Sequence, residues 1–219
     1  MTEALVTCGF TTFNSEKTIK KALNSAIEQD YKNIEIIIVD DNSSDSTLYE
    51  VNAFFGKKNI KYKVIKHNQN LGVAQARNTL LKNANGEFLA FFDSDDVSYK
   101  YRISIQVNCI QKYEIQEKKK DSLNIFSPLC YCDREIFLDN NSIFCKAINL
   151  NKNDLNFKDN IIGALLFCKP FPKNSESGST ATCMLCARVK TLKFLNGFNP
   201  ILRRYEDLDL AIRAIMHEI

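Results

Sequence analysis

The sequence has few residues that break regular structure and no tryptophan. It holds 7 glycines and 4 prolines in 219 residues, which excludes a collagen-like chain and a proline-rich linker protein. Neither charge sign dominates, because 29 Lys and Arg against 26 Asp and Glu give a net charge of +3. This balance excludes a basic nucleic-acid-binding arm and an acidic tail, and we expect no nucleic-acid partner. With 45% hydrophobic and 25% charged residues, the composition is typical of a globular chain.

Long hydrophobic segments are also missing. The longest apolar runs, Ile34–Val39 and Phe88–Phe92, are far too short to cross a bilayer. The N-terminus shows no basic region followed by an apolar run, so a secretory signal is not expected. We therefore predict a cytoplasmic protein, in a compartment where thiols stay reduced.

The eight cysteines allow two interpretations. Cys130-x-Cys132 and Cys183-x-x-Cys186 have the form of a split zinc site. A strand expected over Thr180–Val189 would point two of these thiols to opposite faces, so we favour reduced core cysteines.

Strand and helix signals alternate over the first hundred residues. Apolar, β-branched runs predict strands, and apolar stripes at helical spacing predict helices. Asn14 or Ser15 is suited to cap the first helix. The alternation predicts βαβ units, and therefore an α/β fold with a mostly parallel, Rossmann-like sheet flanked by helices. The expected strands are Leu5–Thr11, Ile34–Val39, Ile60–Lys66 and Phe88–Phe92, and the expected helices carry the stripes Ile19-Leu23-Ala26-Ile27 and Leu48-Val51-Phe54-Phe55 or span Val73–Asn83.

The pattern loosens after Tyr101. We expect one domain over residues 1–219, with a nucleotide-sugar-binding half at 1–100 and an acceptor-side half at 101–219. The second half is expected to contain a helix at Ile103–Tyr113, a solvated charged stretch at Glu117–Asp121, an irregular segment at Ser127–Ser177, the strand named above, a short helix at Lys190–Leu195 and a final helix marked by Leu208, Ile212 and Ile215.

Three polar clusters follow predicted strands. They are Thr12–Asn14, Asp40–Asp45 and Asp93–Asp96. In open α/β sheets, ligands bind outside the carboxyl ends of the strands. The sequence therefore predicts a ligand site at this edge.

Asp93-Ser94-Asp95-Asp96 is the strongest of these clusters. Neighbouring carboxylates repel one another unless a cation offsets their charge, and Mg²⁺ or Mn²⁺ prefers such oxygen ligands. The alternative is a loop that caps the next helix. Asp40-Asp41 presents the same choice, between hydrogen bonds to a nucleoside and capping of a helix together with Ser44 and Asp45.

Two further signals are weaker. Arg77 in the early turns of a helix is suited to neutralise a diphosphate or contact a base, although a surface arginine is the usual alternative. Glu206-Asp207-x-Asp209 opens the last helix, where acids ordinarily complement the helix dipole. Helical spacing places Asp207 on a different face from Glu206.

Other chemistries are disfavoured. The sequence contains no Gly-x-Gly-x-x-Gly and no P-loop, which argues against dinucleotide and ATP binding of the usual kind. The histidines, His67 and His217, stand in no Ser–His–Asp or Cys–His pattern.

Taken in order, these motifs resemble the family-2 glycosyltransferases of the GT-A fold. The resemblance is dense over the first hundred residues and thinner over the last forty. It rests on Thr12-Phe13-Asn14, Val39 to Asp45, Asn70-x-Gly72 with Ala76-Arg77-Asn78, Gly86-Glu87 before Asp93-Ser94-Asp95-Asp96, and Gly197-Phe198 ahead of Glu206-Asp207.

The resemblance implies an inverting, metal-dependent enzyme that uses a nucleotide-diphosphate sugar. It places the nucleotide on Thr12, Asp40, Asp41, Arg77 and Asp93. The family's Asp-x-Asp falls on Asp93 and Asp95, with Asp95 as the expected direct ligand of Mn²⁺ or Mg²⁺, and the catalytic base falls on Asp207.

The implied acceptor is a glycan or a lipid-linked sugar in bacterial surface polysaccharide synthesis, with UDP as the donor nucleotide by family habit. A lipid-linked acceptor would imply weak peripheral association with the inner face of the membrane, although no basic amphipathic helix stands out.

Two departures keep alternatives open. The family commonly has Pro-x-Tyr-Asn where this sequence has Thr11-Thr12-Phe13-Asn14, and the chain ends twelve residues after Asp207. A truncated chain or an enzyme that depends on a partner is therefore expected. The main alternative is a domain that binds a nucleotide sugar or a partner chain without turnover. A nucleotidyltransferase fits less well, because Thr11–Ser15 is not the glycine-rich basic turn it would need.

Overall fold

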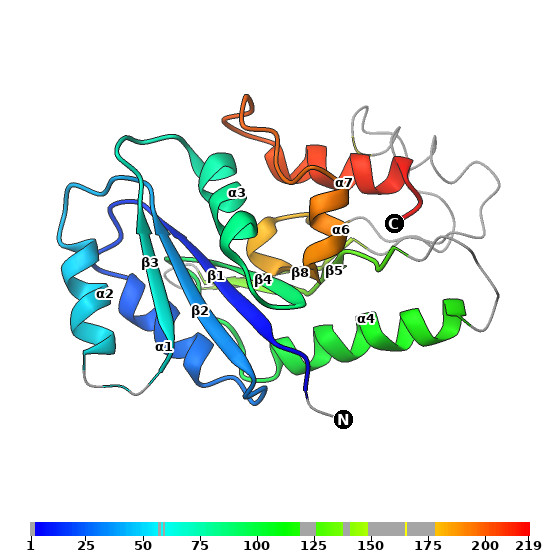
Figure 1. Cartoon of the computed structure of the whole chain (residues 1–219), viewed down its shortest axis with the longest axis horizontal. Coiled ribbons are helices and arrows are strands. Elements are labelled where there is room, and N and C mark those ends of the chain that lie inside the picture. The colour runs from blue at the N-terminus through cyan, green and yellow to red at the C-terminus, as the bar shows by residue number, and fades with distance from the viewer. Residues whose placement is uncertain are drawn as a thin grey trace.

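A six-stranded sheet forms the centre of the molecule (Figure 1). The computed structural model describes residues 3–56, 58, 60–118, 126–137, 141–148, 165 and 178–219. The sheet order is β3-β2-β1-β4-β8-β5. The strands β1 to β4 run parallel, and β8 runs antiparallel to both β4 and β5. The predicted mostly parallel α/β sheet is therefore confirmed. The strands are β1 (Val6–Thr12), β2 (Ile34–Asp40), β3 (Tyr62–Lys66), β4 (Phe88–Asp93), β5 (Cys130–Tyr131) and β8 (Leu185–Arg188).

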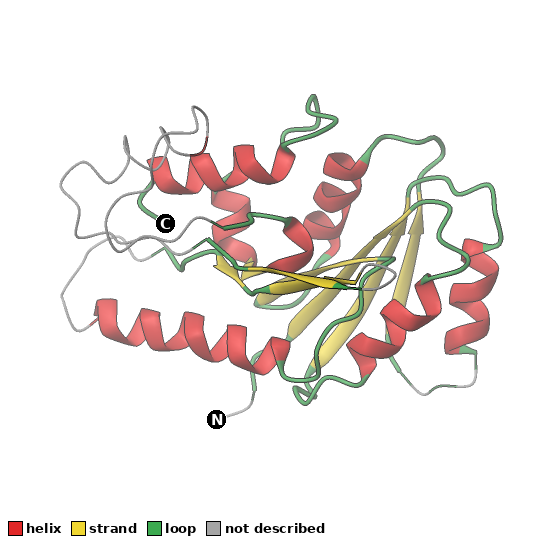
Figure 2. Cartoon of the chain, turned by 180° about the vertical axis from the view of Figure 1, so that it is seen from behind, coloured by secondary structure: helices red, strands yellow, loops and turns green. Residues whose placement is uncertain are grey.

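Helices cover both faces of the sheet (Figure 2). On one face α1 (Ile19–Ile27), α2 (Thr47–Phe55) and α4 (Arg102–Lys118) pack on strand residues such as Phe10 and Ile38. The opposite face carries α3 (Val73–Asn83), α6 (Val189–Phe194) and α7 (Glu206–Met216). Successive residues of β2 and β4 alternate between the two cores, as side chains of a strand must. Their nearly continuous apolar sequence follows from burial on both faces.

Several expectations for the second half are wrong. Within the expected irregular segment, β5 pairs with β8, and β6 (Arg134–Phe137) forms a hairpin with β7 (Ser142–Cys145). These strands depend on their partners more than on their own sequence, so no local pattern announces them. Most of Ser127–Ser177, and the end of Glu117–Asp121, lie outside the described residues.

The expected strand Thr180–Val189 is a 3-10 turn, η1 (Thr182–Met184), followed by the shorter β8. Helix α4 is longer than expected. Helix α1 begins after Thr18, so neither Asn14 nor Ser15 is the N-cap of α1. In α7 the buried stripe consists of Leu210, Ala211, Ala214 and Ile215, while the expected Leu208 and Ile212 are only partly buried.

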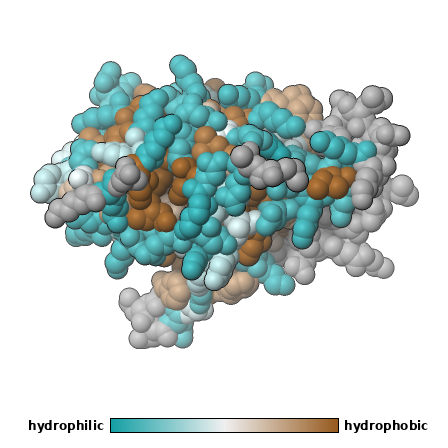
Figure 3. Space-filling model, turned by 60° about the horizontal axis from the view of Figure 1, so that its bottom comes forward, coloured by the Kyte–Doolittle hydropathy of each residue, from teal (hydrophilic) through white to brown (hydrophobic). Residues whose placement is uncertain are grey.

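The surface is mixed. The face beside α4 is mainly hydrophilic with small apolar patches (Figure 3). Among the residues that the structure describes, no helix combines the length and the apolar content needed to cross a bilayer.

Candidate active site

The three predicted polar clusters meet at the carboxyl edge of the sheet. Thr12 lies opposite Asp40 in the β1–β2 register, and Thr11 lies opposite Asp93 in the β1–β4 register. Two hydrogen bonds join the loops: the Asp41 N–H donates to the Thr12 carbonyl oxygen at 2.9 Å, and the Ser15 and Ser94 hydroxyls lie 2.7 Å apart. The convergence predicted from the sequence is therefore present.

Asp40 and Asp41 are buried and already bonded within the protein. Asp40 accepts hydrogen bonds from the N–H and hydroxyl groups of Ser43 at 3.1 and 2.5 Å. Asp41 accepts from the backbone N–H groups of Leu71 and Gly72 at 2.9 and 2.8 Å, and its Oδ1 lies 2.7 Å from His67 Nδ1. These bonds fix the two loops beside the predicted nucleoside position, and they give His67 a structural partner that its sequence context did not suggest.

Helix capping, the alternative for this segment, is present only in part. The N-cap of α2 is Ser46, whose side chain makes no capping hydrogen bond, but Asp45 bonds the first turn. The Asp45 carboxylate accepts the N–H of Thr47, the first residue of α2, at 2.9 Å. It also accepts the N–H of Glu16 at 3.1 Å. Ser44 instead donates from its backbone N–H to Asn14 Oδ1 at 2.9 Å, which ties the β1 and β2 loops together.

Thr12 presents an unused hydrogen-bonding group. Its side-chain Oγ1 is buried and has no hydrogen-bond partner in the described part of the chain. Leaving a buried hydroxyl unpaired costs about 1–3 kcal/mol. The neighbouring Phe13 ring is 48% exposed. A polar ligand bound here would form a hydrogen bond with the Thr12 hydroxyl and would cover the Phe13 ring.

The acidic cluster after β4 divides into two parts. Ligand atoms of Asp93, Asp96 and Cys183 all lie within 4.8 Å of one another. Asp95, the expected metal ligand, is exposed and is not part of this group. Asp96 belonged to the motif, but Cys183 comes from η1, far along the chain, and no sequence signal linked it to the acids.

The electrostatics of this group suit a hard cation. Burial raises the pKa of Asp93, the Asp96 and Asp95 charges add to the rise, and Arg77 opposes it. Burial, followed by the Asp93 and Asp96 carboxylates, raises the pKa of the Cys183 thiol to about 12. Mg²⁺ and Mn²⁺ prefer oxygen ligands, and the Asp93 and Asp96 carboxylates of this group supply them. The residues therefore fit the predicted metal. Cys183 and Cys186 do not join Cys130 and Cys132 in a metal group among the described residues, which removes the zinc alternative there.

Arg77 lies between the acidic cluster and α7. Its guanidinium is buried, donating through Nη1 to Glu206 Oε1 at 2.6 Å and facing Asp93 Oδ1 from Nη2 at 3.5 Å. It also lies over the Phe198 ring, 5.5 Å from the centroid. Its Nε is buried with no hydrogen-bond partner within the described residues. The surface alternative for Arg77 is therefore wrong, and the structure joins it to two acids of the predicted site.

The three acids that open α7 have different surroundings. Glu206 is buried against Arg77, and Asp209 pairs with Arg213 at 2.7 Å, one helical turn away. Asp207 is partly buried and forms no ion pair among the described residues; one of its oxygens accepts the Leu208 N–H at 2.7 Å. Tyr205, immediately before them, has a left-handed backbone with φ 65°. Asp207 is thus the acid of this turn left available for a ligand.

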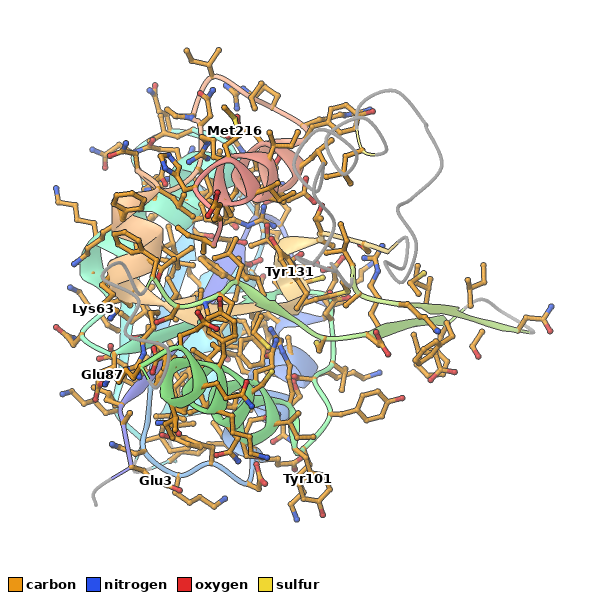
Figure 4. All side chains as sticks on the ribbon, turned by 90° about the vertical axis from the view of Figure 1, so that its right-hand side faces the viewer. Glu3, Lys63, Glu87, Tyr101, Tyr131 and Met216 are labelled. Carbon is orange, nitrogen blue, oxygen red and sulfur yellow. The ribbon has the colours of Figure 1, made fainter. Side chains whose placement is uncertain are left out.

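Tyr131 is a site residue that sequence reasoning missed. Its hydroxyl is buried without a hydrogen-bond partner in the described ranges. Burial raises the pKa of Tyr131, the Asp207 charge adds to the rise, and the Arg77 charge opposes it. In Figure 4, Tyr131 lies near the centre of the molecule, below α7. A short strand inside an unpatterned segment gave no signal for it.

The Ala76-Arg77-Asn78 and Gly197-Phe198 motifs are joined directly. The Asn78 amide donates to the Phe198 carbonyl oxygen at 2.7 Å and accepts the Phe198 N–H at 2.8 Å. Phe198 in turn packs edge-on against Phe91 of β4, with ring centroids 5.4 Å apart. The pairing fixes the ring that Arg77 covers.

Gly197→Ala is expected to lower the free energy of unfolding by about 1–3 kcal/mol. Gly197 has φ +64°, and a Cβ there would lie 2.4 Å from Asn78 Oδ1. The control is Gly56→Ala at the end of α2, where φ is −57° and the nearest atom is 3.2 Å away. Urea unfolding of both variants measures the difference; equal stabilities would contradict the assigned role of Gly197.

Comparisons with known proteins agree with this geometry. Residues 8–116 match the family model described as Glycosyl transferase family 2. The chain is 36% identical over 115 residues to UDP-Glc:alpha-D-GlcNAc-diphosphoundecaprenol beta-1,3-glucosyltransferase WfgD of Escherichia coli, a match that covers 52% of this chain and 44% of that relative. The chain therefore spans less than half the length of this relative.

Two solved structures show the same fold. TarS 1-349 of S. aureus in complex with UDP has a TM-score of 0.65 at 23% identity, covering 95% of this chain and 54% of that one. Mannosyltransferase PcManGT from Pyrobaculum calidifontis in complex with GDP-Man and Mn2+ has a TM-score of 0.63 at 17% identity, covering 96% and 52%. Identities this low support the shared fold, GT-A, and nothing finer.

Proposed function

Because this chain belongs to glycosyl transferase family 2, we propose that it transfers a sugar from a nucleotide-diphosphate donor to an acceptor hydroxyl. The observation that carries the proposal is the cluster at the carboxyl edge of the sheet. There a pair of carboxylates and a buried arginine lie beside polar atoms that are unsatisfied within the described residues, and Asp207, which forms no ion pair with those residues, follows directly after the arginine's partner Glu206. That arrangement has the parts that sugar transfer from a diphosphate requires.

We assign the donor nucleotide to the edge formed by Thr12, Asp40, Asp41, Arg77 and Asp93. The Thr12 hydroxyl, which has no partner among the residues described, and the exposed Phe13 ring support a ligand there. Asp40, Asp41 and Arg77 would act mainly by holding the loops and the acidic cluster in place, since each already has partners in the protein. UDP is the proposed nucleotide, in line with the relative that uses UDP-Glc and the neighbour solved with UDP.

Mn²⁺ or Mg²⁺ is the proposed cofactor. Asp93 would hold it together with Asp95, as the family motif implies, or with Asp96, as the grouping of side chains favours. When bound, the cation would offset the charge that develops on the leaving diphosphate.

Asp207 is the proposed catalytic base. It would accept the proton of the acceptor hydroxyl as that oxygen forms a bond to the anomeric carbon. The bond from the same carbon to the donor phosphate oxygen breaks, and the nucleoside diphosphate leaves. A single displacement without an enzyme nucleophile inverts the anomeric configuration.

For the acceptor we propose a glycan or a lipid-linked sugar of a surface polysaccharide. The support is the E. coli relative, whose printed substrate is a diphosphoundecaprenol-linked sugar. Such an acceptor would bring the protein to the cytoplasmic face of the membrane by peripheral association.

The donor site is tested by calorimetric titration with UDP, GDP, CDP and TDP, each with Mn²⁺ and with EDTA. We expect UDP to bind with Mn²⁺ and to lose at least roughly tenfold in affinity with EDTA, because neighbouring carboxylates repel a bare diphosphate. Asp93→Asn is expected to remove the difference in UDP affinity between Mn²⁺ and EDTA. Comparing Asp95→Asn with Asp96→Asn decides which acid completes the site.

Asp30→Asn is the matched control, since that carboxylate accepts a hydrogen bond from Ser104 at 2.9 Å, between α1 and α4 and away from the carboxyl edge. Failure of every nucleotide to bind would contradict the donor assignment. Binding without transfer from any bound nucleotide sugar would favour the non-catalytic alternative.

A further inference from the structure

Tyr131 lies on the face of the sheet that carries α7. In β5 it pairs with Leu185 of β8, and the strand is held further by the Cys132 N–H donating to the Met184 carbonyl oxygen at 3.1 Å. Its ring packs on the core cluster that includes Leu210 and Ala214 of α7. The preceding Cys130 points to the opposite core, as alternation along a strand requires. The backbone therefore directs the Tyr131 side chain to the face of the sheet that α7 covers.

The Tyr131 hydroxyl lacks the partner that a buried phenol usually finds. It is buried and forms no hydrogen bond within the described residues. Buried Tyr hydroxyl groups are normally paired, because an unpaired one is destabilising. Arg77 Nε, a donor in the same part of the molecule, is buried and likewise has no partner in the described ranges. Two unsatisfied polar groups near one acid indicate a missing polar ligand.

The charges around Tyr131 indicate whether its hydroxyl donates or accepts a hydrogen bond. Asp207 raises the pKa of Tyr131 and Arg77 lowers it, so both charges act on the phenol. Burial makes the largest contribution to the rise, and the phenol stays protonated at neutral pH. A protonated hydroxyl donates a hydrogen bond, and Asp207 as a carboxylate accepts one.

We propose that Tyr131 is a substrate-positioning residue whose hydroxyl donates a hydrogen bond to the acceptor hydroxyl that Asp207 deprotonates. The inference rests on the proposed function. An attacking hydroxyl has one proton and two lone pairs. The proton goes to Asp207, one lone pair forms the bond to the anomeric carbon, and the second accepts the hydrogen bond from Tyr131. Tyr131 thus selects an acceptor hydroxyl in one orientation.

Tyr131→Phe tests this, since it removes the hydroxyl and keeps the ring. Transfer is measured to GlcNAc-diphosphoundecaprenol and to poly(ribitol phosphate), the acceptors in the names of the E. coli relative and of S. aureus TarS, using the nucleotide sugar that wild type binds. We expect kcat/KM for the acceptor to fall roughly 10–100-fold, as expected for a lost hydrogen bond in a buried site. The affinity for UDP with Mn²⁺ is expected to stay within about twofold of wild type, because the hydroxyl faces the acceptor. The thermal midpoint is expected to be unchanged or higher, because no internal hydrogen bond is lost.

The control is Tyr62→Phe on β3, at the opposite edge of the sheet, where the ring stacks on Phe55. It should leave transfer unchanged. Unchanged acceptor kinetics in Tyr131→Phe would overturn the inference and leave the proposed function in place. A lower thermal midpoint with a parallel loss of UDP affinity would do the same. No transfer by wild type to either acceptor would overturn the proposed function, and the inference with it.

Discussion

Replacement of Asp207 by Asn is expected to lower the rate of sugar transfer by roughly 10²–10⁴-fold, the range that a general base contributes. Asparagine has nearly the same shape but accepts no proton at neutral pH. Binding of UDP with Mn²⁺ should be retained, because the residues assigned to the nucleotide and the metal lie on other elements. The measurement is single-turnover transfer alongside calorimetric titration of UDP.

The assignment of the base to Asp207 depends on its neighbours. Glu206 forms a 2.6 Å ion pair with Arg77, and Asp209 forms an ion pair with Arg213. Carboxylate oxygens that already accept hydrogen bonds from a guanidinium are not free to accept the proton of an acceptor hydroxyl. Asp207 has no such pair in the described part of the chain, and its charge reaches the Tyr131 phenol in the interior.

Asp209→Asn is the matched control, because it makes the same chemical change in the same helical turn. Its pair with Arg213 is partly exposed, with both side chains at 28%, and such i,i+4 pairs contribute only about 0.3–0.5 kcal/mol. Transfer by Asp209→Asn should stay near that of wild type. Wild-type rates in Asp207→Asn, or equal losses in the two variants, would show that the base lies elsewhere.

The fold was predictable wherever local pattern determines structure. The strands β2 and β4 are buried on both faces, so their apolar runs are unbroken and easily recognised. The strand β5 is two residues long and exists because β8 pairs with it. In α7 the helix was found, but its buried stripe was displaced, because packing against α3 and α6 selected Leu210 and Ala214 rather than Leu208 and Ile212.

The sequence predicted which loops form the candidate site, but it did not predict the side-chain contacts within the site. The sequence placed Thr12, Asp40 and Asp93 at one edge, since strand ends of a parallel sheet must meet there. It gave no sign that Arg77 pairs with Glu206, because the two residues lie 129 positions apart. Cys183 and Tyr131 reach the site only through the antiparallel β8 and its neighbour, which follow no spacing rule.

Arg77→Met is expected to lower the free energy of unfolding by about 3–5 kcal/mol, the cost of leaving a buried charge unpaired. The Arg77 and Glu206 side chains are 7% and 10% exposed, so water cannot replace the lost partner. Adding Glu206→Gln to Arg77→Met removes the stranded charge, and the double variant should recover part of the loss. Urea unfolding of the two single variants and the double variant measures this coupling.

The same pair has a consequence for transfer. Arg77 on α3 holds Glu206, the residue before Asp207, while its other nitrogen faces Asp93. The position of the candidate base and the charge of the candidate metal site therefore depend on one guanidinium. Glu206→Gln should reduce transfer more than it reduces UDP affinity, because it loosens the turn at Asp207 and leaves Asp93 in place. If Arg77→Met costs no more stability than Asp209→Asn, the pair behaves as a surface contact and this linkage is wrong.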